Sequence, residues 1–157
     1  ARIGLRLCIE NIEVELVEPV VDFVRRVDRP NFLMNFDTGH AFLASRYFHF
    51  DFLGSLRSAL PVLGHLHLND NTGVFEELRI TDRPRYNGLS MGYRRTFGRG
   101  DIHVPPFWGA IPFAEVFALL KDYRGLFVCE YGAEAFTPFN RSVQEKVRQA
   151  IAAARSV

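Results

Sequence analysis

Acidic and imidazole side chains stand directly after, or at the end of, four short apolar runs. They are Glu10, Asp37, His67 and Glu130. Short apolar runs are typical of buried parallel strands, whose carboxyl ends all lie on one face of the sheet. Carboxylates gathered on one face repel one another unless protons or a cation neutralise them. The sequence therefore predicts that these four residues bind one divalent metal ion, and mixed oxygen and imidazole donors suit Mn, Zn, Co, Fe or Mg.

Each of these residues also has an ordinary structural interpretation. A glutamate after a strand often caps a helix or lies on the surface, and a lone histidine is often satisfied in the core. The four matching placements in one chain are what favour a metal site. His49 and His65 are expected to be structural, and His65, two residues before His67 on the same strand, could support it from below.

Composition favours one ordinary domain spanning residues 1–157. The chain is 48% hydrophobic and carries a formal net charge of +1, which gives no overall attraction to nucleic acid or membrane. Seventeen of the 19 basic residues are arginine, a residue suited to fixed, planar contacts with carboxylate or phosphate. These features are compatible with a small anionic or polar substrate.

The cysteines and the apolar runs bear on the compartment. Cys8 and Cys129 both lie inside apolar runs, where reduced cysteines fill the core, so a reducing cytoplasm is the expectation. No apolar run approaches the roughly 20 residues that span a bilayer. The start of the chain has no signal-peptide layout and no methionine, as in a piece cut from a longer protein.

The elements that must position the ligands alternate along the chain. Strands are predicted at 3–9, 32–36, 62–68 and 126–129. Helical periodicity predicts helices from Val17 to Val27, over 41–60 in two pieces around 49–51, from Pro112 to Leu120, and through Ala154 with Asn140 or Ser142 as its cap. This alternation implies an α/β fold with a parallel sheet and right-handed crossovers.

Residues 71–100 form a long polar stretch without a convincing period. A loop of about 30 residues is uncommon in a compact domain unless it is functional, so we expect a lid or substrate loop with room for a short hairpin. Its arginines either contact an anionic substrate or belong to a solvated loop balanced by Glu76, Glu77 and Asp82. They are Arg79, Arg83, Arg85, Arg94, Arg95 and Arg99.

Five motifs in this order resemble the xylose isomerase-like barrels, a family that includes sugar phosphate isomerases and epimerases and the endonuclease IV type of abasic-site nuclease. The motifs are Ile9-Glu10-Asn11, Asp37-Thr38-Gly39-His40, His67-Leu68-Asn69-Asp70, Asp101-Ile102-His103 and Val128-Cys129-Glu130. The resemblance covers nearly the whole chain. It implies about four βα units that correspond to the C-terminal half of a (β/α)8 TIM barrel.

The resemblance also implies roles for residues beside the four metal ligands. His40 would be a substrate or second-metal ligand. Asp101 and His103 would bind a further metal in the nuclease branch and lie at the pocket edge in the sugar branch. Asp70 and Trp108 are also expected to contact substrate. One departure is Gly73, where ketose epimerases tend to have an arginine that binds phosphate or hydroxyl groups.

The function implied is a divalent-metal-dependent sugar or sugar phosphate isomerase or epimerase. The metal would hold two adjacent sugar oxygens and stabilise the enediolate formed when a carbon-bound proton leaves. Glu10 and Glu130 would remove and return that proton. One alternative is an endonuclease IV-like metal-dependent phosphodiester hydrolase. Another is an inactive half-barrel whose open sheet edges require a second copy or a missing N-terminal half.

Overall fold

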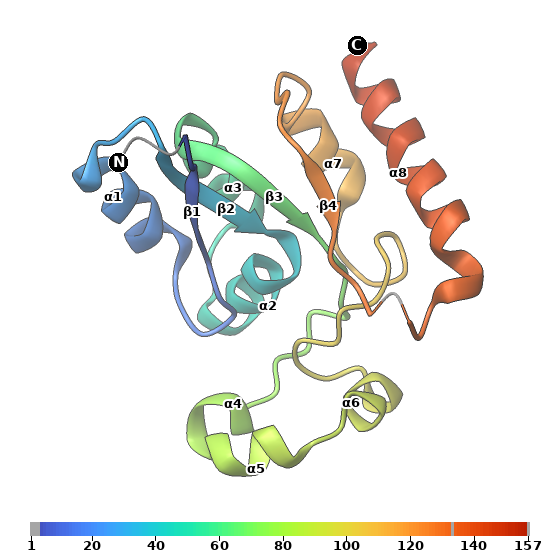
Figure 1. Cartoon of the computed structure of the whole chain (residues 1–157). Coiled ribbons are helices and arrows are strands. Elements are labelled where there is room, and N and C mark those ends of the chain that lie inside the picture. The colour runs from blue at the N-terminus through green and yellow to red at the C-terminus, as the bar shows by residue number, and fades with distance from the viewer. Residues whose placement is uncertain (1–3, 133, 157) are drawn as a thin grey trace.

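The computed structural model describes residues 4–132 and 134–156 (Figure 1). Four strands form one parallel sheet in the order β1-β2-β3-β4. They are β1 (Leu7–Glu10), β2 (Phe32–Asp37), β3 (Leu63–Leu68) and β4 (Phe127–Cys129). Helices connect successive strands, which confirms the predicted α/β fold.

The helices fall into two groups along the chain. Those of the βα units are α1 (Val17–Val27), α2 (Thr38–Phe48), α3 (Phe52–Ala59), the 3-10 turn Leu60–Val62, α7 (Phe113–Leu119), the 3-10 turn Thr137–Phe139 and α8 (Asn140–Arg155). Three short helices lie between β3 and α7: α4 (Leu78–Thr81), α5 (Arg83–Gly88) and α6 (Met91–Phe97). Figure 1 shows this second group on the side of the sheet where the strands end.

The hydrophobic core lies on one face of the sheet only. Met34, Phe36, Leu66 and Leu68 are fully buried against the helices. Side chains alternate between the two faces of a strand. The other, inner face is therefore lined by the intervening residues, and no helix of the described part of the chain forms a layer over it.

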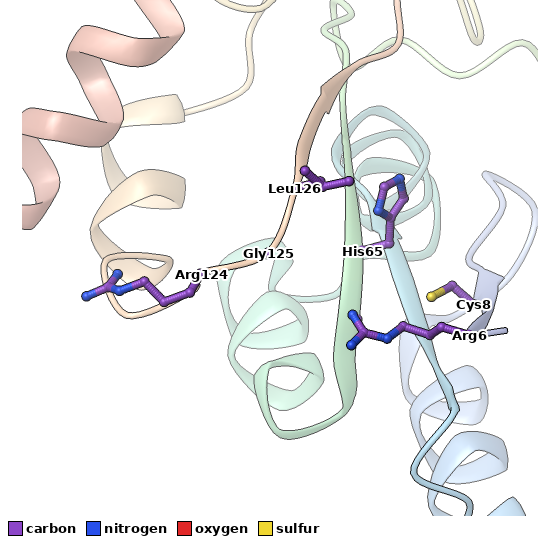
Figure 2. A pocket seen from close by; sticks show the side chains of 7 residues that line it. Arg6, Cys8, His65, Arg124, Gly125 and Leu126 are labelled. Carbon is purple, nitrogen blue, oxygen red and sulfur yellow. The ribbon is translucent and has the colours of Figure 1, made fainter. Parts of the chain in front are cut away.

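The inner face is open to solvent at the amino ends of its strands. Val128 in β4 is 36% exposed, and Leu126, just before β4 and on the same face, is 69% exposed. A hollow of about 430 Å³ lies there (Figure 2), lined by Arg6, Cys8, Gly64, His65, Arg124, Gly125 and Leu126. An uncovered inner face is what a barrel cut in half would present.

Local sequence explains where several helices begin and end. Asp37 caps α2 by accepting a hydrogen bond from the backbone N–H of His40, so the helix starts three residues before the predicted position. His49 has a left-handed backbone (φ 59°) at the end of α2, and this break confirms the two helical pieces. The predicted cap of the last helix was wrong: Phe139 occupies the cap position, and the hydroxyl of Ser142 donates to its carbonyl.

The segment 71–100 contains helices, so the predicted hairpin was wrong. The side chain of Asp82 accepts from the backbone N–H of Arg85, and that of Ser90 accepts from the backbone N–H of Tyr93. Proline at the start of α5 adds to these caps, and both features favour helix starts over a strand turn.

The start of the first strand and the state of the cysteines were also predicted. β1 begins at Leu7, later than the predicted start at residue 3. Residues 4–6 are not part of the strand, and residues 1–3 lie outside the described part. Cys8 and Cys129 are both free and partly buried.

Among the described helices, none has the length and apolar character that crossing a bilayer requires.

The exposed inner face predicts self-association. We expect the purified chain to show a mass above that of a monomer in multi-angle light scattering, because paired copies cover the open sheet edges and the exposed apolar side chain of Leu126 on the inner face. Leu126→Glu should shift the protein toward monomer. Ile80→Glu on α4, at a side chain that is 47% exposed, should leave the mass unchanged. A monomer at every concentration would contradict this expectation.

Candidate metal centre

The strand register brings the four predicted ligands to one point. Glu10 and Asp37 end β1 and β2, His67 lies next to the end of β3, and Glu130 follows β4. Asp37 and His67 are direct partners in the β2–β3 register. One ligand atom from each of the four residues lies within 4.8 Å of all the others, so a single ion could contact all of them. We call this set the primary cluster.

One imidazole nitrogen faces all three carboxylates of the primary cluster. The Nδ1 atom of His67 is 2.9 Å from Glu130 Oε2, 3.2 Å from Glu10 Oε1 and 3.9 Å from Asp37 Oδ2. The amide nitrogen of Asn35 is also 3.1 Å from this Nδ1, and the Oδ1 atom of Asn35 is buried with no hydrogen-bond partner among the described residues. Oxygen and imidazole donors in this number match the requirements of a divalent transition metal.

Asp37 is the fixed member of the primary cluster. Its side chain is fully buried; Oδ1 accepts from the backbone N–H of His40 at 2.7 Å, and Oδ2 accepts from the Asn69 amide at 2.8 Å. Burial raises the pKa of Asp37 to about 7; the charge of His40 opposes this rise, and those of Asp101 and Glu10 add to it. A buried carboxylate with this tendency to bind a proton is also one that a cation would stabilise.

Two asparagines to which sequence reasoning gave no role hold this region together. Asn11 donates to the carbonyl oxygen of Asp37 and accepts from its N–H, at 3.1 and 3.0 Å. Asn69 binds the Asp37 carboxylate, as described above, and packs closely on Gly39, where a Cβ atom would collide with its Oδ1. Both asparagines stand inside the five motifs, which was the available signal for their importance.

A second cluster lies beside the first and consists of His40, Asp101 and His103. The Oδ2 atom of Asp101 is 2.8 Å from His103 Nε2 and 3.4 Å from His40 Nε2. The Oδ1 atom of Asp101 is buried and has no hydrogen-bond partner in the described part of the chain. An orphaned carboxylate oxygen between two imidazoles fits a cation-binding position.

The two histidines of the second cluster are oriented by backbone carbonyls. His40 Nδ1 is 3.0 Å from the carbonyl oxygen of Asn11, and His103 Nδ1 is 2.7 Å from that of Glu130. A carbonyl oxygen only accepts, so each Nδ1 carries a proton and each Nε2 is the atom available to a metal. Metal-binding histidines in proteins are usually oriented in this way.

The charges of the second cluster depend on one another. Burial lowers the pKa of both imidazoles, but the hydrogen bonds and charge of Asp101, together with Asp37, outweigh it and raise the pKa of His40 to about 10 and that of His103 to about 9. For Asp101, burial raises the pKa, and hydrogen bonds from His103 and His40 reverse this and hold it below its usual value. Near neutral pH these shifts favour the imidazolium form of both histidines and the ionised form of Asp101 in metal-free protein.

The structure places the remaining predicted site residues outside both clusters. Asp70 is fully buried, and its carboxylate accepts from the backbone N–H groups of Asn71, Gly109 and Ile111 at 2.8, 2.8 and 3.1 Å. We therefore assign Asp70 to holding the following loops and no longer to substrate contact. Trp108 is half-exposed and packs edge-on against Phe136 and Phe139, and its contact with substrate stays a prediction.

His65 packs its ring edge-on against His67, with ring centroids 5.2 Å apart. It is only partly buried and lines the open hollow of Figure 2. The structure therefore favours support of His67 over packing in the core.

We compared the chain with known protein families, curated proteins and solved structures. The model of the family described as xylose isomerase-like TIM barrel matches residues 1–157. A D-tagatose 3-epimerase-like protein aligns with a TM-score of 0.61 at 20% identity, over 98% of this chain and 49% of that one. None of the curated proteins matches the chain.

Two further solved structures are similar. A xylose isomerase domain protein from Planctomyces limnophilus aligns with a TM-score of 0.61 at 17% identity, over 97% of this chain and 47% of the other. D-psicose 3-epimerase with D-tagatose from Clostridium cellulolyticum H10 aligns with a TM-score of 0.54 at 19% identity, over 98% of this chain and 50% of the other. The chain therefore spans about half the length of these proteins, and at such identities the likeness concerns the fold.

The second cluster predicts a pH-dependent stability in chelator-treated protein. The raised pKa values of His40 and His103 make their pairing with Asp101 stabilising below the ordinary histidine pKa of 6.5, and this contribution is lost as pH rises through about 9 to about 10. Asp101→Asn should therefore lower the free energy of unfolding by about 3 kcal/mol near neutral pH and by much less near the upper end of that range. Urea unfolding across pH measures this difference, and a difference that is constant with pH would contradict the pairing.

Proposed function

The chain belongs to the xylose isomerase-like TIM barrel family, and from that premise we propose that it carries the metal centre of a divalent-metal-dependent sugar or sugar phosphate isomerase or epimerase. The observation that carries this proposal is the convergence of Glu10, Asp37, His67 and Glu130 within 4.8 Å. The names of two similar structures, a D-tagatose 3-epimerase-like protein and D-psicose 3-epimerase, support the sugar substrate.

The primary cluster fits a divalent cation in donor chemistry. It combines three carboxylates with one imidazole, and one of the carboxylates is fully buried. Mn, Zn, Co, Fe and Mg all accept such donors. A divalent cation held there would supply a Lewis acid that favours negative charge on adjacent sugar oxygens.

Proton transfer is assigned to Glu10 and Glu130. Their side chains are 30% and 42% exposed, whereas Asp37 is completely enclosed. The two glutamates come from β1 and from the end of β4, the two outer strands of the sheet, so they can approach a sugar carbon from different directions. One removes a carbon-bound proton and the other returns it, while Asp37 serves only as a ligand.

The proposal also concerns the part of the substrate pocket that this chain does not form. The similar structures are about twice as long as the part this chain matches, and an open inner face lies beside the primary cluster. We propose that a second half-barrel, from another copy or from an N-terminal half, completes the substrate pocket. A cytoplasmic location remains a prediction from the two free cysteines.

A second candidate is metal-assisted hydrolysis of a phosphodiester. The observation in its favour is the second cluster of His40, Asp101 and His103, since such hydrolysis uses more than one metal ion. The net charge of +1 offers no general attraction to DNA. Salt-dependent binding of DNA with an abasic site would favour this candidate over the sugar enzyme.

The proton-transfer assignment is tested by solvent exchange. Metal-loaded protein is incubated with D-tagatose or D-psicose in D2O, and NMR follows deuterium entering the carbon-bound positions. Glu130→Gln should slow exchange by about 100-fold or more because the carboxylate that accepts the proton is gone. The protein should keep its fold by circular dichroism.

Glu134→Gln, four residues along the same segment, is the matched control and should exchange at the wild-type rate. Unimpaired exchange in Glu130→Gln would reject its role. Absence of exchange with every sugar and sugar phosphate offered, both in self-associated wild-type protein and in wild-type protein combined with an N-terminal half-barrel, would reject the isomerase or epimerase.

A further inference from the structure

We propose that helix α6 positions the second cluster, with Arg95 and Arg94 as positioning residues that hold the backbone of residues 101–103 in its metal-binding conformation. This inference rests on the metal centre of the proposed function and extends it, because it takes His40, Asp101 and His103 to bind a second cation beside the primary cluster. It gives the segment 71–100 a defined structural role, which is to build part of the site from outside the barrel.

Two adjacent arginines bind three successive carbonyl groups. Arg94 Nη1 donates to the carbonyl of Asp101 at 3.2 Å. Arg95 donates from Nε to the carbonyl of Ile102 at 2.9 Å and from Nη2 to that of His103 at 3.4 Å. The whole backbone of the Asp101–His103 motif is therefore fixed by one turn of α6.

The motif needs such support because its conformation is unfavourable for the free chain. His103 has a left-handed backbone, with φ of 42°, which residues other than glycine rarely adopt. This turn brings the imidazole of His103 back to the carboxylate of Asp101, two residues earlier. A relaxed backbone would separate the two side chains, and the second cluster would lose its geometry.

The arginines themselves are held by aromatic rings. Arg94 lies over the ring of Tyr86, 4.9 Å from its centroid, and donates to its hydroxyl at 2.7 Å. Arg95 lies 4.9 Å from the centroid of Phe136. Tyr86 is buried, and Arg79, which also lies over its ring, pairs with the buried Glu13 in the loop after β1. Tyr86 therefore links Arg94, through Arg79, to the loop after β1, and Phe136 fixes Arg95 from the segment after β4.

The planar shape of the Arg95 guanidinium group is what allows it to bind two carbonyl groups at once. Its planar fork reaches two carbonyl oxygens from one side chain, whereas the single ammonium of lysine acts as a point donor. Arg95→Lys should therefore recover part of the effect lost in Arg95→Met. Partial recovery separates positioning by hydrogen bonds from mere filling of space.

The test is a cobalt titration of metal-free protein. Bound Co²⁺ is counted by elemental analysis, and the visible ligand-field spectrum reports the geometry at each site. Wild-type protein should bind two equivalents. Arg95→Met should keep the first equivalent at close to wild-type affinity and bind the second about 10- to 100-fold more weakly. Arg95→Lys should bind the second equivalent with an affinity between those of wild type and Arg95→Met. Arg83→Met, at an exposed arginine of α5, should bind both equivalents like wild type.

A second measurement on the same metal-free proteins reads the backbone directly. Hydrogen–deuterium exchange of peptides covering 101–104 should speed up in Arg95→Met, with β2 and β3 unchanged. Unchanged exchange together with an unchanged second equivalent would overturn the positioning role, and so would an equal loss of both equivalents. Wild-type protein that binds only one equivalent would overturn this inference but leave the primary cluster standing. Wild-type protein that binds none would refute the proposed metal centre itself.

Discussion

Mutual repulsion among carboxylates is the constraint around which this structure is arranged. Glu10, Asp37 and Glu130 approach a single imidazole nitrogen of His67 at the carboxyl edge of the sheet, and burial makes the charge on Asp37 costly. A fold keeps such a group only if something neutralises it. The hydrogen bonds from Asn11 and Asn69 hold Asp37 in place but carry no positive charge. Neutralisation is left to protons, including the one on His40, whose Nδ1 is 3.7 Å from Asp37 Oδ1, or to a cation.

The two ligand clusters are mechanically connected. His40 directs one ring nitrogen to the backbone after Glu10, and His103 directs one to the backbone of Glu130. Each histidine of the second cluster is therefore oriented by a strand end that also carries a ligand of the first. Helix α6 then holds the backbone of the second cluster at residues 101–103 through Arg94 and Arg95. A segment that looks like a loop in sequence is thereby part of the site.

Sequence reasoning succeeded where the answer depends on local pattern and strand direction. Apolar runs ending in Asp37 or His67 indicate both a strand and the edge at which its last side chains emerge. The pattern could not orient Asp70, whose carboxylate turns to the backbone of a distant loop. Nor could it bring residues 40 and 103 together, because that contact depends on the left-handed turn at His103 and on packing by α6. The resemblance to a family, and not periodicity, pointed to those residues.

The most direct test of this account is the metal content of the chain purified without chelator. We predict at least one equivalent of a divalent transition metal per chain, lost when Asp37→Asn removes the enclosed carboxylate and kept when Asp122→Asn, at an exposed aspartate after α7, makes the same chemical change elsewhere. Wild-type protein without bound metal that also takes up none on addition of Mn²⁺, Co²⁺ or Zn²⁺ would contradict the account, as would equal metal content in wild type and Asp37→Asn.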